Sequence, residues 1–371
     1  MQKIVRSRLF VFLVILIFCA GGIMGCSTSN KGPSAGTPQA GSKEAEAPGE
    51  KAGADSVNIN LAHFFPAVHP VEGFCQLWKE AVEEATDGQV TVTTYPGETL
   101  STAAEMYEGV ATGIADAGIS VFGYTAGRFP LLEVLELPGT IFNNSVVASY
   151  TTWEAIKQFQ PEEVQDTKMM MAWATGPGDL YTKDPVRTLE ELKGMEIRAF
   201  GLTVETLEAL GAVPVAMTQA EVYEAISKGV VKGNLAPIEA LEGWRQAEVT
   251  NYLTRTPFLY NATFFFAMNL DVWNSLSPEI QDTILEVNDK LFAESACKLW
   301  DGMNESALKF AVEETGMEVL ELSPDEFERW RTQVMPIQER FVKDLEARGF
   351  PGKEFMDLVL ELSEKYNELY G

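Results

Sequence analysis

Hydrophobic and polar positions alternate where the globular part of the chain begins. Val57, Ile59 and Leu61 are separated by two asparagines, and a period of two is typical of a half-buried strand. From 71 to 85 the apolar residues recur at helical spacing, and a second alternating stretch follows at 90–93. A strand, a helix and a strand joined by short connections predict a parallel sheet covered by helices.

The same pattern continues to about residue 350. We expect strands near 115–120, 169–174, 196–198, 213–217, 230–231 and 264–268, with helices at 103–112, 203–210 and 220–228. Thr218 and Glu221 have capping-box spacing before the last of these helices. Ser277-Pro278 opens a helical stretch to about 314, and a second capping box at Ser323 opens another to about 348. The predicted fold class is α/β, with two lobes and a helical tail.

The N-terminal residues predict export. Three basic residues precede an apolar run at 9–20, which resembles a signal peptide and is shorter than the roughly 20 residues of a membrane-spanning helix. Cys26 follows Ile-Met-Gly, as in the bacterial lipobox, so we expect a signal peptide at 1–25 and a lipid on Cys26; secretion without a lipid is the alternative. Residues 27–54 lack Val, Ile, Leu, Met and aromatic residues and predict a flexible linker over 26–55, spanning roughly 30 Å.

Charge narrows the choice of partner. The chain carries 28 basic and 54 acidic residues, and removal of the signal peptide takes away three basic residues and moves the formal net charge from −26 to −29. Nucleic acid is therefore not expected as a partner, because binding phosphates needs a basic face. An anionic small molecule would need a locally positive pocket, which directs attention to individual arginines.

Two cysteines remain after Cys19 leaves with the signal peptide and Cys26 takes the lipid. Cys75 and Cys297 both fall on apolar helical faces, where a buried thiol behaves as a small hydrophobic group. We expect free thiols, and a disulfide in an exported protein is the alternative.

Catalytic and metal-binding motifs are not found in the sequence. There is no Gly-x-Ser-x-Gly elbow, and His63 and His69 are the only histidines, so no His-rich metal site is expected. Gly176-Pro177-Gly178 lacks the remaining residues of a phosphate-binding loop and is interpreted as a turn. The sequence predicts neither an enzyme nor a cofactor.

A set of motifs in the middle of the chain carries a family resemblance. The segments are LEELKGMEIR (189–198), LGAVPVAM (210–217), EVY (221–223), GVVKG (229–233) and Pro237, with further matches at HP (69–70), TDGQV (86–90), YPG (95–97), FPL (129–131), LP (137–138), MN (268–269), Trp273 and LSPEIQ (276–281). Their order resembles the DctP-type solute-binding proteins, which are the extracytoplasmic receptors of tripartite ATP-independent periplasmic (TRAP) transporters. The resemblance covers about 57–281.

The resemblance implies a periplasmic-binding-protein-like (Venus flytrap) fold with a long hinge helix. We assign lobe 1 to 56–174 and 264–305, and lobe 2 with the C-terminal helices to 175–263 and 306–371. The implied function is capture of a small organic acid between the lobes and its delivery to the TRAP permease subunits. A receptor of an ATP-driven importer and, with less support, a lipoprotein hydrolase are the alternatives.

Arg198 stands where the family has an arginine that pairs with the ligand carboxylate. A guanidinium suits this role because its planar fork of donors matches a carboxylate and keeps its charge. Three positions depart from the family pattern: Ala236 replaces a ligand-binding asparagine, Gln219 replaces a phenylalanine, and Asp179 lies where a second arginine is expected. These departures favour a monocarboxylate over a dicarboxylate or a sialic acid.

The remaining candidate ligand contacts lie near the ends of predicted strands. They are His63, Phe64, Phe65, Ser120, Trp173, Asn234 and Phe265. An amine or hydroxyl of the ligand would contact Asp179 or Gln219, and an apolar group would contact the aromatic residues.

Overall fold

Two β-sheets organise residues 56–371, the part of the chain that the computed structural model describes. The predicted signal peptide, Cys26 and the predicted linker up to residue 55 lie outside the described part. The strands are β1 (Val57–His63), β2 (Val90–Tyr95), β3 (Ala117–Val121), β4 (Thr167–Ala174), β5 (Asp179–Thr182), β6 (Glu196–Ala199), β7 (Val213–Ala216), β8 (Gly233–Ala236), β9 (Tyr252–Arg255), β10 (Thr263–Asn269) and β11 (Glu318–Glu321).

Twelve α-helices lie in the described residues. They are α1 (Pro70–Ala85), α2 (Met106–Ala111), α3 (Ser145–Phe159), α4 (Leu189–Leu192), α5 (Thr203–Ala209), α6 (Val222–Ser227), α7 (Ala240–Gly243), α8 (Leu270–Ser275), α9 (Pro278–Glu294), α10 (Leu299–Glu313), α11 (Pro324–Ala347) and α12 (Gly352–Tyr370). Short 3₁₀ segments include η1 (Phe122–Tyr124), η4 (Gln219–Glu221) and η6 (Ala296–Lys298).

The first sheet has the strand order β2-β1-β3-β10-β4. β1 runs parallel to β2 and β3, whereas β10 is antiparallel to both β3 and β4. All residues of β3 and β10 are buried, as expected for central strands with both faces covered. Because successive side chains of a strand point to opposite faces, only alternate residues of these strands can face a given cavity.

The second sheet has the order β11-β9-β5-β8-β6-β7. β6 is parallel to β7 and β8, and β5 is antiparallel to β8 and β9. The carboxyl ends of parallel strands meet at one edge of a sheet, where ligands bind in open α/β folds. This edge carries Arg198 near the end of β6.

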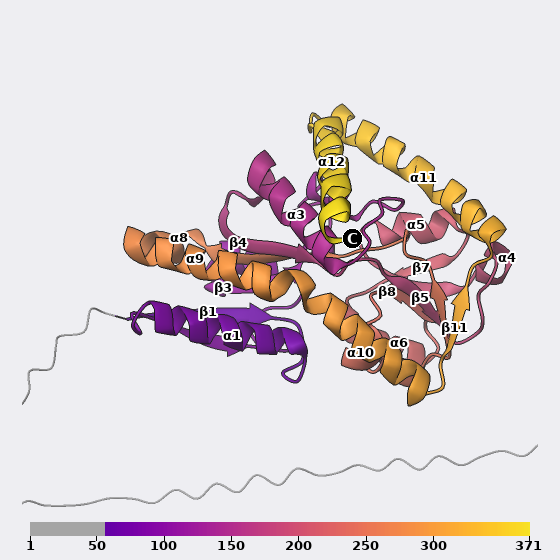
Figure 1. Cartoon of the computed structure of the whole chain (residues 1–371), viewed down its shortest axis with the longest axis horizontal. Helices are drawn as coiled ribbons and strands as arrows, with labels where there is room; N and C mark the ends of the chain where they lie inside the picture. Colours follow the sequence, from indigo (N-terminus) through magenta and orange to yellow (C-terminus); the bar gives the residue numbers. More distant parts are fainter. Residues whose placement is uncertain (1–55) are drawn as a thin grey trace, which may run out of the picture. The chain divides into compact units, whose positions relative to one another are not determined.

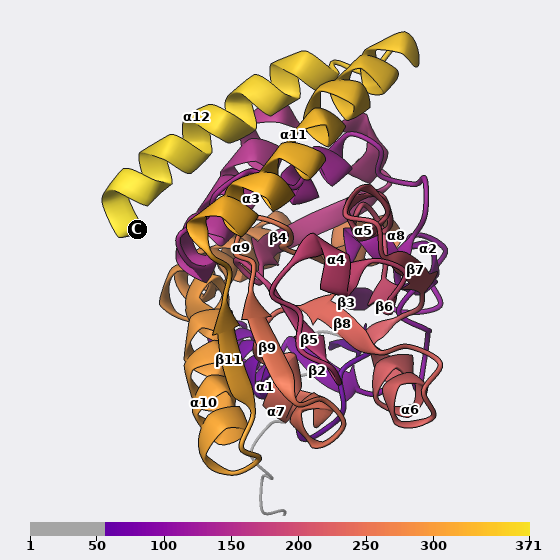
Figure 2. The ribbon, with the colours of Figure 1, turned by 90° about the vertical axis from the view of Figure 1, so that its right-hand side faces the viewer.

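Helices cover both sheets (Figures 1 and 2). α1 packs against β2 and α9, and α9 is followed through η6 by α10, which packs against α7 beside the second sheet. α11 packs against α5, and α12 returns to pack along α3. The ring centroids of Tyr150 in α3 and Tyr366 in α12 are 5.3 Å apart. The helices after residue 277 therefore contact elements of both sheets.

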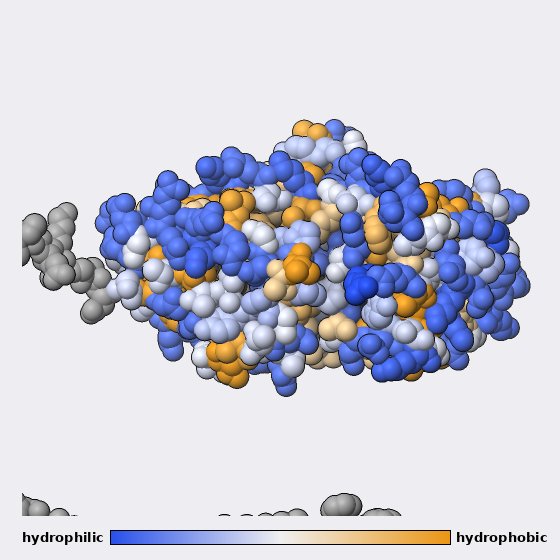
Figure 3. All heavy atoms as spheres, turned by 90° about the horizontal axis from the view of Figure 1, so that it is seen from below, coloured by the Kyte–Doolittle hydropathy of each residue, from blue (hydrophilic) through white to orange (hydrophobic). Residues whose placement is uncertain are grey.

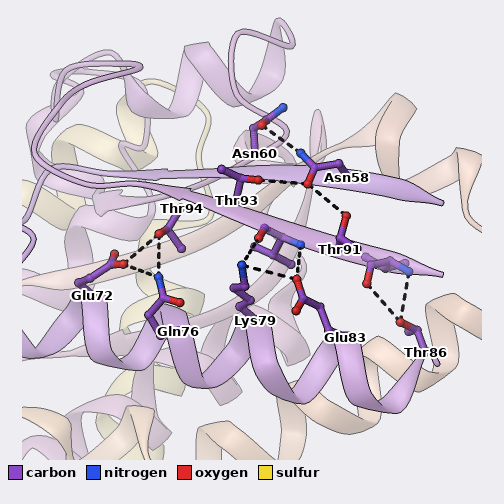
Figure 4. A network of polar contacts seen from close by, with 12 residues as sticks. Asn58, Asn60, Glu72, Gln76, Lys79, Glu83, Thr86, Thr91, Thr93 and Thr94 are labelled. Carbon is purple, nitrogen blue, oxygen red and sulfur yellow. Dashed lines mark hydrogen bonds and ion pairs between the residues drawn. The ribbon is translucent and has the colours of Figure 1, made fainter. Parts of the chain in front are cut away.

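Polar contacts fix α1 on its sheet (Figure 4). Lys79 Nζ donates to the Val92 carbonyl at 2.8 Å, and the Val92 amide donates to Glu83 at 2.9 Å. Nearer the start of the helix, Glu72 accepts from Gln76 at 2.6 Å and from Thr94 at 2.9 Å. These bonds set the position of the β1–α1 connection, which contributes Phe64, Phe65 and His69 to the site below.

The predicted α/β class is confirmed, and several helix boundaries are close to those expected. Ser277 accepts from the Ile280 amide at the start of α9, and Ser323 accepts from the Glu326 amide at the start of α11. The predicted continuous helix over 278–314 is interrupted by η6. There the Cys297 carbonyl accepts a hydrogen bond from Ser145 at the start of α3.

The strand predicted at 230–231 is wrong. Val230 is 55% exposed in a turn, and Val231 packs under α6. The strand begins at Gly233 instead, where an added Cβ would lie 2.1 Å from the Tyr181 carbonyl oxygen of β5. Only glycine permits this close pairing of β5 with β8, so the two valines carry a misleading strand signal.

Cys75 and Cys297 are buried free thiols, as expected from their helical faces. In the view of Figure 3 the hydrophobic side chains form small separate groups on a mainly hydrophilic face. Within residues 56–371, none of the helices has the length and apolar character needed to cross a membrane.

Candidate ligand-binding site

Arg198 lies at the carboxyl end of β6, in the second sheet. It pairs in register with Val215 of β7 and Asn234 of β8, so the side chains of these cross-strand neighbours lie on the same face. The Arg198 side chain is only 1% exposed. Sequence position and strand register together place a guanidinium in the interior, at the sheet edge expected for a ligand.

Only neutral groups hold the Arg198 guanidinium. Nε donates to the Met217 carbonyl at 3.0 Å, Nη2 donates to the Tyr124 hydroxyl at 3.1 Å, and Nη1 lies 3.4 Å from Asn234 Oδ1. Its carbon Cζ is 4.7 Å from the centroid of the Phe200 ring. None of the carboxylates in residues 56–371 forms an ion pair with it. A buried cation without an acidic partner carries an uncompensated desolvation cost, so an anion would be bound favourably here.

Gln219 extends this set of donors. Its Oε1 lies 3.4 Å from Asn234 Nδ2, and its backbone amide donates to the Tyr124 hydroxyl at 3.2 Å. Its Nε2 is buried without an acceptor in the described structure. Asn234 also donates to Gln246 at 2.9 Å. Because Asn234 is held in this way, it helps to position the side chains of Arg198 and Gln219.

A cavity of about 30 Å³ has Arg198 and Gln219 in its wall. The other lining residues come from both sheets and their connections, and they are Phe64, Phe65, Val121, Tyr124, Thr175, Pro237, Glu239, Ala240, Trp244, Tyr260, Ala262, Phe264 and Trp300. Seven of the 15 are aromatic, which makes the cavity suited to a flat apolar group. Ligand pockets usually measure about 300–1,000 Å³, so the walls must separate before an organic ligand can enter.

Aromatic contacts cross from the first sheet to the second. Phe64, just after β1, lies parallel to Trp244, with the ring centroids 6.1 Å apart, and Phe64 also packs edge-on against Tyr124 at 5.6 Å. Trp300 of α10 stacks on Phe264 of β10 at 4.7 Å. The Trp300 Nε1 donor is buried without an acceptor in residues 56–371. The cavity thus combines aromatic walls with unused donors.

Glu239 is the acidic residue in this lining, and it is held by His69. His69 Nε2 lies 2.6 Å from Glu239 Oε1, while His69 Nδ1 accepts from the Val71 amide at 3.2 Å. Glu239 also lines a groove of about 470 Å³ on its other side, with Val68, His69 and Met303 among the groove residues. Glu239 therefore borders both the cavity and this groove.

Burial and neighbouring charges shift the titration of groups around the cavity. Burial raises the pKa of Tyr260 well above its ordinary value; Arg198 opposes this shift, and Glu136 and Glu239 add to it. Burial likewise raises the pKa of Tyr124, against the effect of Arg198. Both phenols therefore remain neutral hydrogen-bonding groups at physiological pH. Tyr260 lies within electrostatic reach of Arg198 and of Glu239.

Among the residues predicted from sequence, Arg198, Gln219, Phe64 and Phe65 line the cavity. Asp179 does not. Its Oδ1 accepts from the Thr256 amide at 2.6 Å, and its Oδ2 lies 3.0 Å from Arg255 Nε as an ion pair without a directed hydrogen bond. Burial raises its pKa to about 6. The carboxylate thus ties β5 to the end of β9.

Strand geometry turns other predicted contacts away from the cavity. Ser120 donates to the Ala103 carbonyl at 2.7 Å, and its neighbour Val121 lines the cavity instead. Phe265 packs against Tyr107 and Phe122, whereas Phe264 faces the cavity.

Three further residues predicted to contact the ligand pack against other parts of the protein. Trp173 stacks behind Phe264 at 5.8 Å, and the Ala236 carbonyl accepts from the Tyr181 hydroxyl at 2.6 Å. His63 contacts Glu72 at 2.6 Å. None of these three is among the lining residues.

His63, Glu72 and Cys75 form a group of potential metal ligands whose ligand atoms lie within 4.8 Å of one another. Burial lowers the pKa of His63, against the effect of Glu72, and raises that of Cys75 well above its ordinary value. Glu72 already accepts from Gln76 and Thr94 (Figure 4). This group is separate from the cavity lining.

Sequence reasoning missed most of the lining residues contributed by loops and by helix starts. Tyr124, Glu239, Trp244, Tyr260 and Trp300 lie in or beside irregular segments, where the alternation of apolar residues gives no direction. The position of Glu239 could have been inferred from one feature of the sequence, because it comes two residues after Pro237 of the family motif.

The protein has two β-sheets covered by helices and a cavity near the carboxyl ends of strands. Aromatic side chains and hydrogen-bond donors line this cavity, a combination typical of a ligand-binding protein. The chain belongs to the bacterial extracellular solute-binding proteins of family 7 (DctP), whose family model matches residues 61–344. It is therefore a TRAP-type solute-binding receptor and not an enzyme.

Individual relatives agree with this membership. The 2,3-diketo-L-gulonate-binding periplasmic protein YiaO of Escherichia coli K12 is 26% identical over 244 residues, which is 62% of this chain and 74% of YiaO. A TRAP periplasmic solute-binding protein of Desulfovibrio salexigens is 34% identical in sequence, with a TM-score of 0.74 over 84% of this chain and 97% of that chain. A marine metagenome TRAP solute-binding protein specific for aromatic acids, in complex with 3-hydroxybenzoate, is 28% identical, with a TM-score of 0.80 over 84% and 99% of the two chains.

Proposed function

We propose that this protein captures a small monocarboxylate in the cavity and that Arg198 binds the ligand carboxylate. The observation that carries the proposal is a buried guanidinium with no acidic partner in residues 56–371. Isolated charges are expensive to bury and are usually paired. A ligand carboxylate would supply the missing partner and would accept two parallel hydrogen bonds.

Gln219 is proposed as a second carboxylate donor through Nε2, which has no acceptor in the described structure. Its Oε1 is turned towards Asn234, so the free amide nitrogen is the group left for a ligand. A neutral donor beside a guanidinium adds a charge-assisted hydrogen bond without a second cation. One cation and one amide suit a single carboxylate.

The body of the ligand is proposed to be apolar or aromatic. Seven aromatic residues line the cavity, and flat rings favour stacked or edge-to-face packing against other rings. The metagenome relative, in complex with 3-hydroxybenzoate at 28% identity and a TM-score of 0.80, supports this class. YiaO is named for a sugar acid, so the test must include sugar acids.

Binding is proposed to require separation and closure of two lobes, with the boundaries 56–174 plus 264–305 and 175–263 plus 306–371. The strands of the first sheet fall in the first set, apart from Thr263, and those of the second sheet fall in the second. The cavity of about 30 Å³ is too small for an organic acid, which supports an opening motion before binding. A ligand with contacts to both lobes would select the closed form.

The loaded receptor is proposed to deliver its ligand to a TRAP permease while it is anchored outside the cytoplasm through Cys26. The supporting observations are the lipobox-like position of Cys26 and the polar composition of 27–54. The mass of the N-terminal peptide tests the anchor: a diacylglycerol-modified Cys26 is expected, and an unmodified mature N-terminus would contradict it. A Cys26→Ser variant is the control.

Native mass spectrometry of the protein purified from bacteria, followed by calorimetry, tests the ligand class. We expect a co-purified organic acid, and micromolar or tighter binding to at least one of benzoate, 3-hydroxybenzoate and mandelate. Galactonate and succinate represent sugar acids and dicarboxylates, and we expect weaker binding of both. Tightest binding to succinate would overturn the monocarboxylate assignment.

A further inference from the structure

We infer that Glu239 is a specificity-determining ligand contact, and that the preferred ligand carries a hydrogen-bond donor, a hydroxyl or an ammonium, in addition to its carboxylate. This inference rests on the proposed function, because it takes Arg198 as the carboxylate site. It adds a second polar contact among the lining residues of the same cavity. Glu239 is 4% exposed and comes directly before α7.

The hydrogen bonds of His69 determine which of its ring nitrogens carries the proton. The Val71 amide donates to His69 Nδ1 at 3.2 Å, so this nitrogen carries no proton. Nε2 is then the protonated nitrogen of a neutral imidazole, and it donates to Glu239 Oε1 at 2.6 Å. Glu239 Oε1 is thus the acceptor in this pair, and its partner is a neutral imidazole.

Several contacts hold Glu239 in place. Its backbone amide donates to Asn304 Oδ1 of α10 at 2.8 Å. Gly243 leaves space for the side chain, since a Cβ there would lie 2.2 Å from Glu239 Oε1 and 3.0 Å from His69 Nε2. His69 is itself stacked on Phe65, with the ring centroids 4.5 Å apart. His69 is therefore a positioning residue for Glu239.

One oxygen of Glu239 remains available. Oε1 accepts from His69, whereas Oε2 accepts no hydrogen bond from the described part of the chain. Arg198 and Glu239 line the same cavity, so the cavity offers a cation to a carboxylate and an anionic acceptor to a donor. An acceptor that a bound ligand shields from water without pairing it is costly, which makes such a site selective.

The charge of Glu239 also excludes one ligand class. A second carboxylate placed against it would meet a like charge in a water-poor cavity, where repulsion is strong. A hydroxyl or an ammonium group would be accepted there. Glu239 and Arg198 therefore both favour a monocarboxylate ligand.

Calorimetry with a matched ligand series tests the inference on the full mature chain. The series is benzoate, 3- and 4-hydroxybenzoate, 4-(aminomethyl)benzoate and isophthalate. Wild type is expected to bind at least one donor-bearing acid about tenfold more tightly than benzoate, the value of one hydrogen bond to a charged group. Isophthalate is expected to bind more weakly than benzoate. The hydroxyl and aminomethyl compounds distinguish a neutral from a cationic donor.

Glu239→Gln is the decisive variant. The Gln Oε1 still accepts from His69, so the fold is preserved, but the free group changes from an acceptor to a donor. The preference for the donor-bearing acid should fall below about threefold, and isophthalate should gain about tenfold in affinity, a gain that a purely structural role would not produce. Glu242→Gln, at an exposed position of the same short helix, is the matched control and should behave as wild type.

The outcomes separate the two proposals. Equal binding of benzoate and all donor-bearing acids by wild type, or a Glu239→Gln variant with the wild-type pattern, would overturn the role of Glu239 and leave the carboxylate site intact. Failure of wild type to bind any carboxylate of the series or of the earlier panel would overturn the proposed function itself.

Discussion

Glu136 is a buried carboxyl group whose titration couples pH to stability. Its Oε1 accepts from the Thr263 amide at 2.7 Å and from the Thr263 hydroxyl at 2.6 Å. Burial nevertheless raises its pKa from 4.5 to about 7, against the effect of these bonds. Between these two values the folded state holds more protons than the unfolded state, so stability falls as the pH rises through this window.

Glu136→Gln should remove this component of the pH dependence. The amide keeps an oxygen for Thr263 and does not ionise. Relative to wild type, the variant's free energy of unfolding should increase from pH 4 to pH 8 by up to about 3 kcal/mol, from about 1.4 kcal/mol per pKa unit. Urea unfolding at a series of pH values measures the difference. Glu190→Gln, an exposed acid with a lowered pKa, is the control, and a flat difference for Glu136→Gln would refute the assignment.

Individual residues of the cavity lining were only partly predictable from the sequence. Arg198 and Gln219 were found because motif spacing fixes their position relative to β6 and η4. The choice of Phe265 over Phe264 failed because three consecutive phenylalanines give no alternation. The direction of each ring depends on the pairing of β10 with β3 and β4, which only the folded chain defines.

At the element scale, Gly243 at the end of α7 limits how closely this helix approaches the β1–α1 connection. No positive backbone φ requires glycine here; the constraint is the space taken by Glu239 and His69. Gly73 of α1 differs, because an added Cβ there meets nothing within 4 Å. The two glycines form a matched pair for a test.

Gly243→Ala should destabilise the protein by about 1–3 kcal/mol, as overpacking of a filled interior does, and should displace the His69–Glu239 hydrogen bond. Gly73→Ala should stabilise it by about 0.5–1 kcal/mol through helix propensity. Denaturant unfolding measures both changes, and NMR of the His69 ring protons reports the hydrogen bond. Equal effects of the two substitutions would contradict the packing argument.

Helix starts and amphipathic faces were the elements most readable from sequence. Ser277 and Ser323 cap α9 and α11 as expected, because capping is a local interaction. The four-residue strands β5, β9 and β11 were missed because they carry too few residues to show a period, although β6 and β7, of the same length, were predicted. The break at η6 depends on Ser145, far away in sequence, and has no local signal.

At the scale of the whole molecule, the cavity joins two sheets that each contribute part of the site. The second sheet and the segments that follow its strands supply Arg198, Gln219 and Glu239, and the first sheet and its connections supply Phe64, Tyr124 and Phe264. The sequence predicted both α/β units because each alternates strands and helices along the chain. It did not predict that α12 returns to α3, since that contact depends on long-range packing.

Calorimetry of Arg198→Ala tests whether Arg198 binds the ligand carboxylate. With the tightest carboxylate of the panel as ligand, removal of one partner of a buried charge pair should weaken binding at least about 30-fold, from a cost of about 2–5 kcal/mol. Arg187→Ala removes an arginine from an exposed ion pair with Glu318 and should bind as wild type. Undiminished affinity in a folded Arg198→Ala variant would show that Arg198 does not bind the carboxylate.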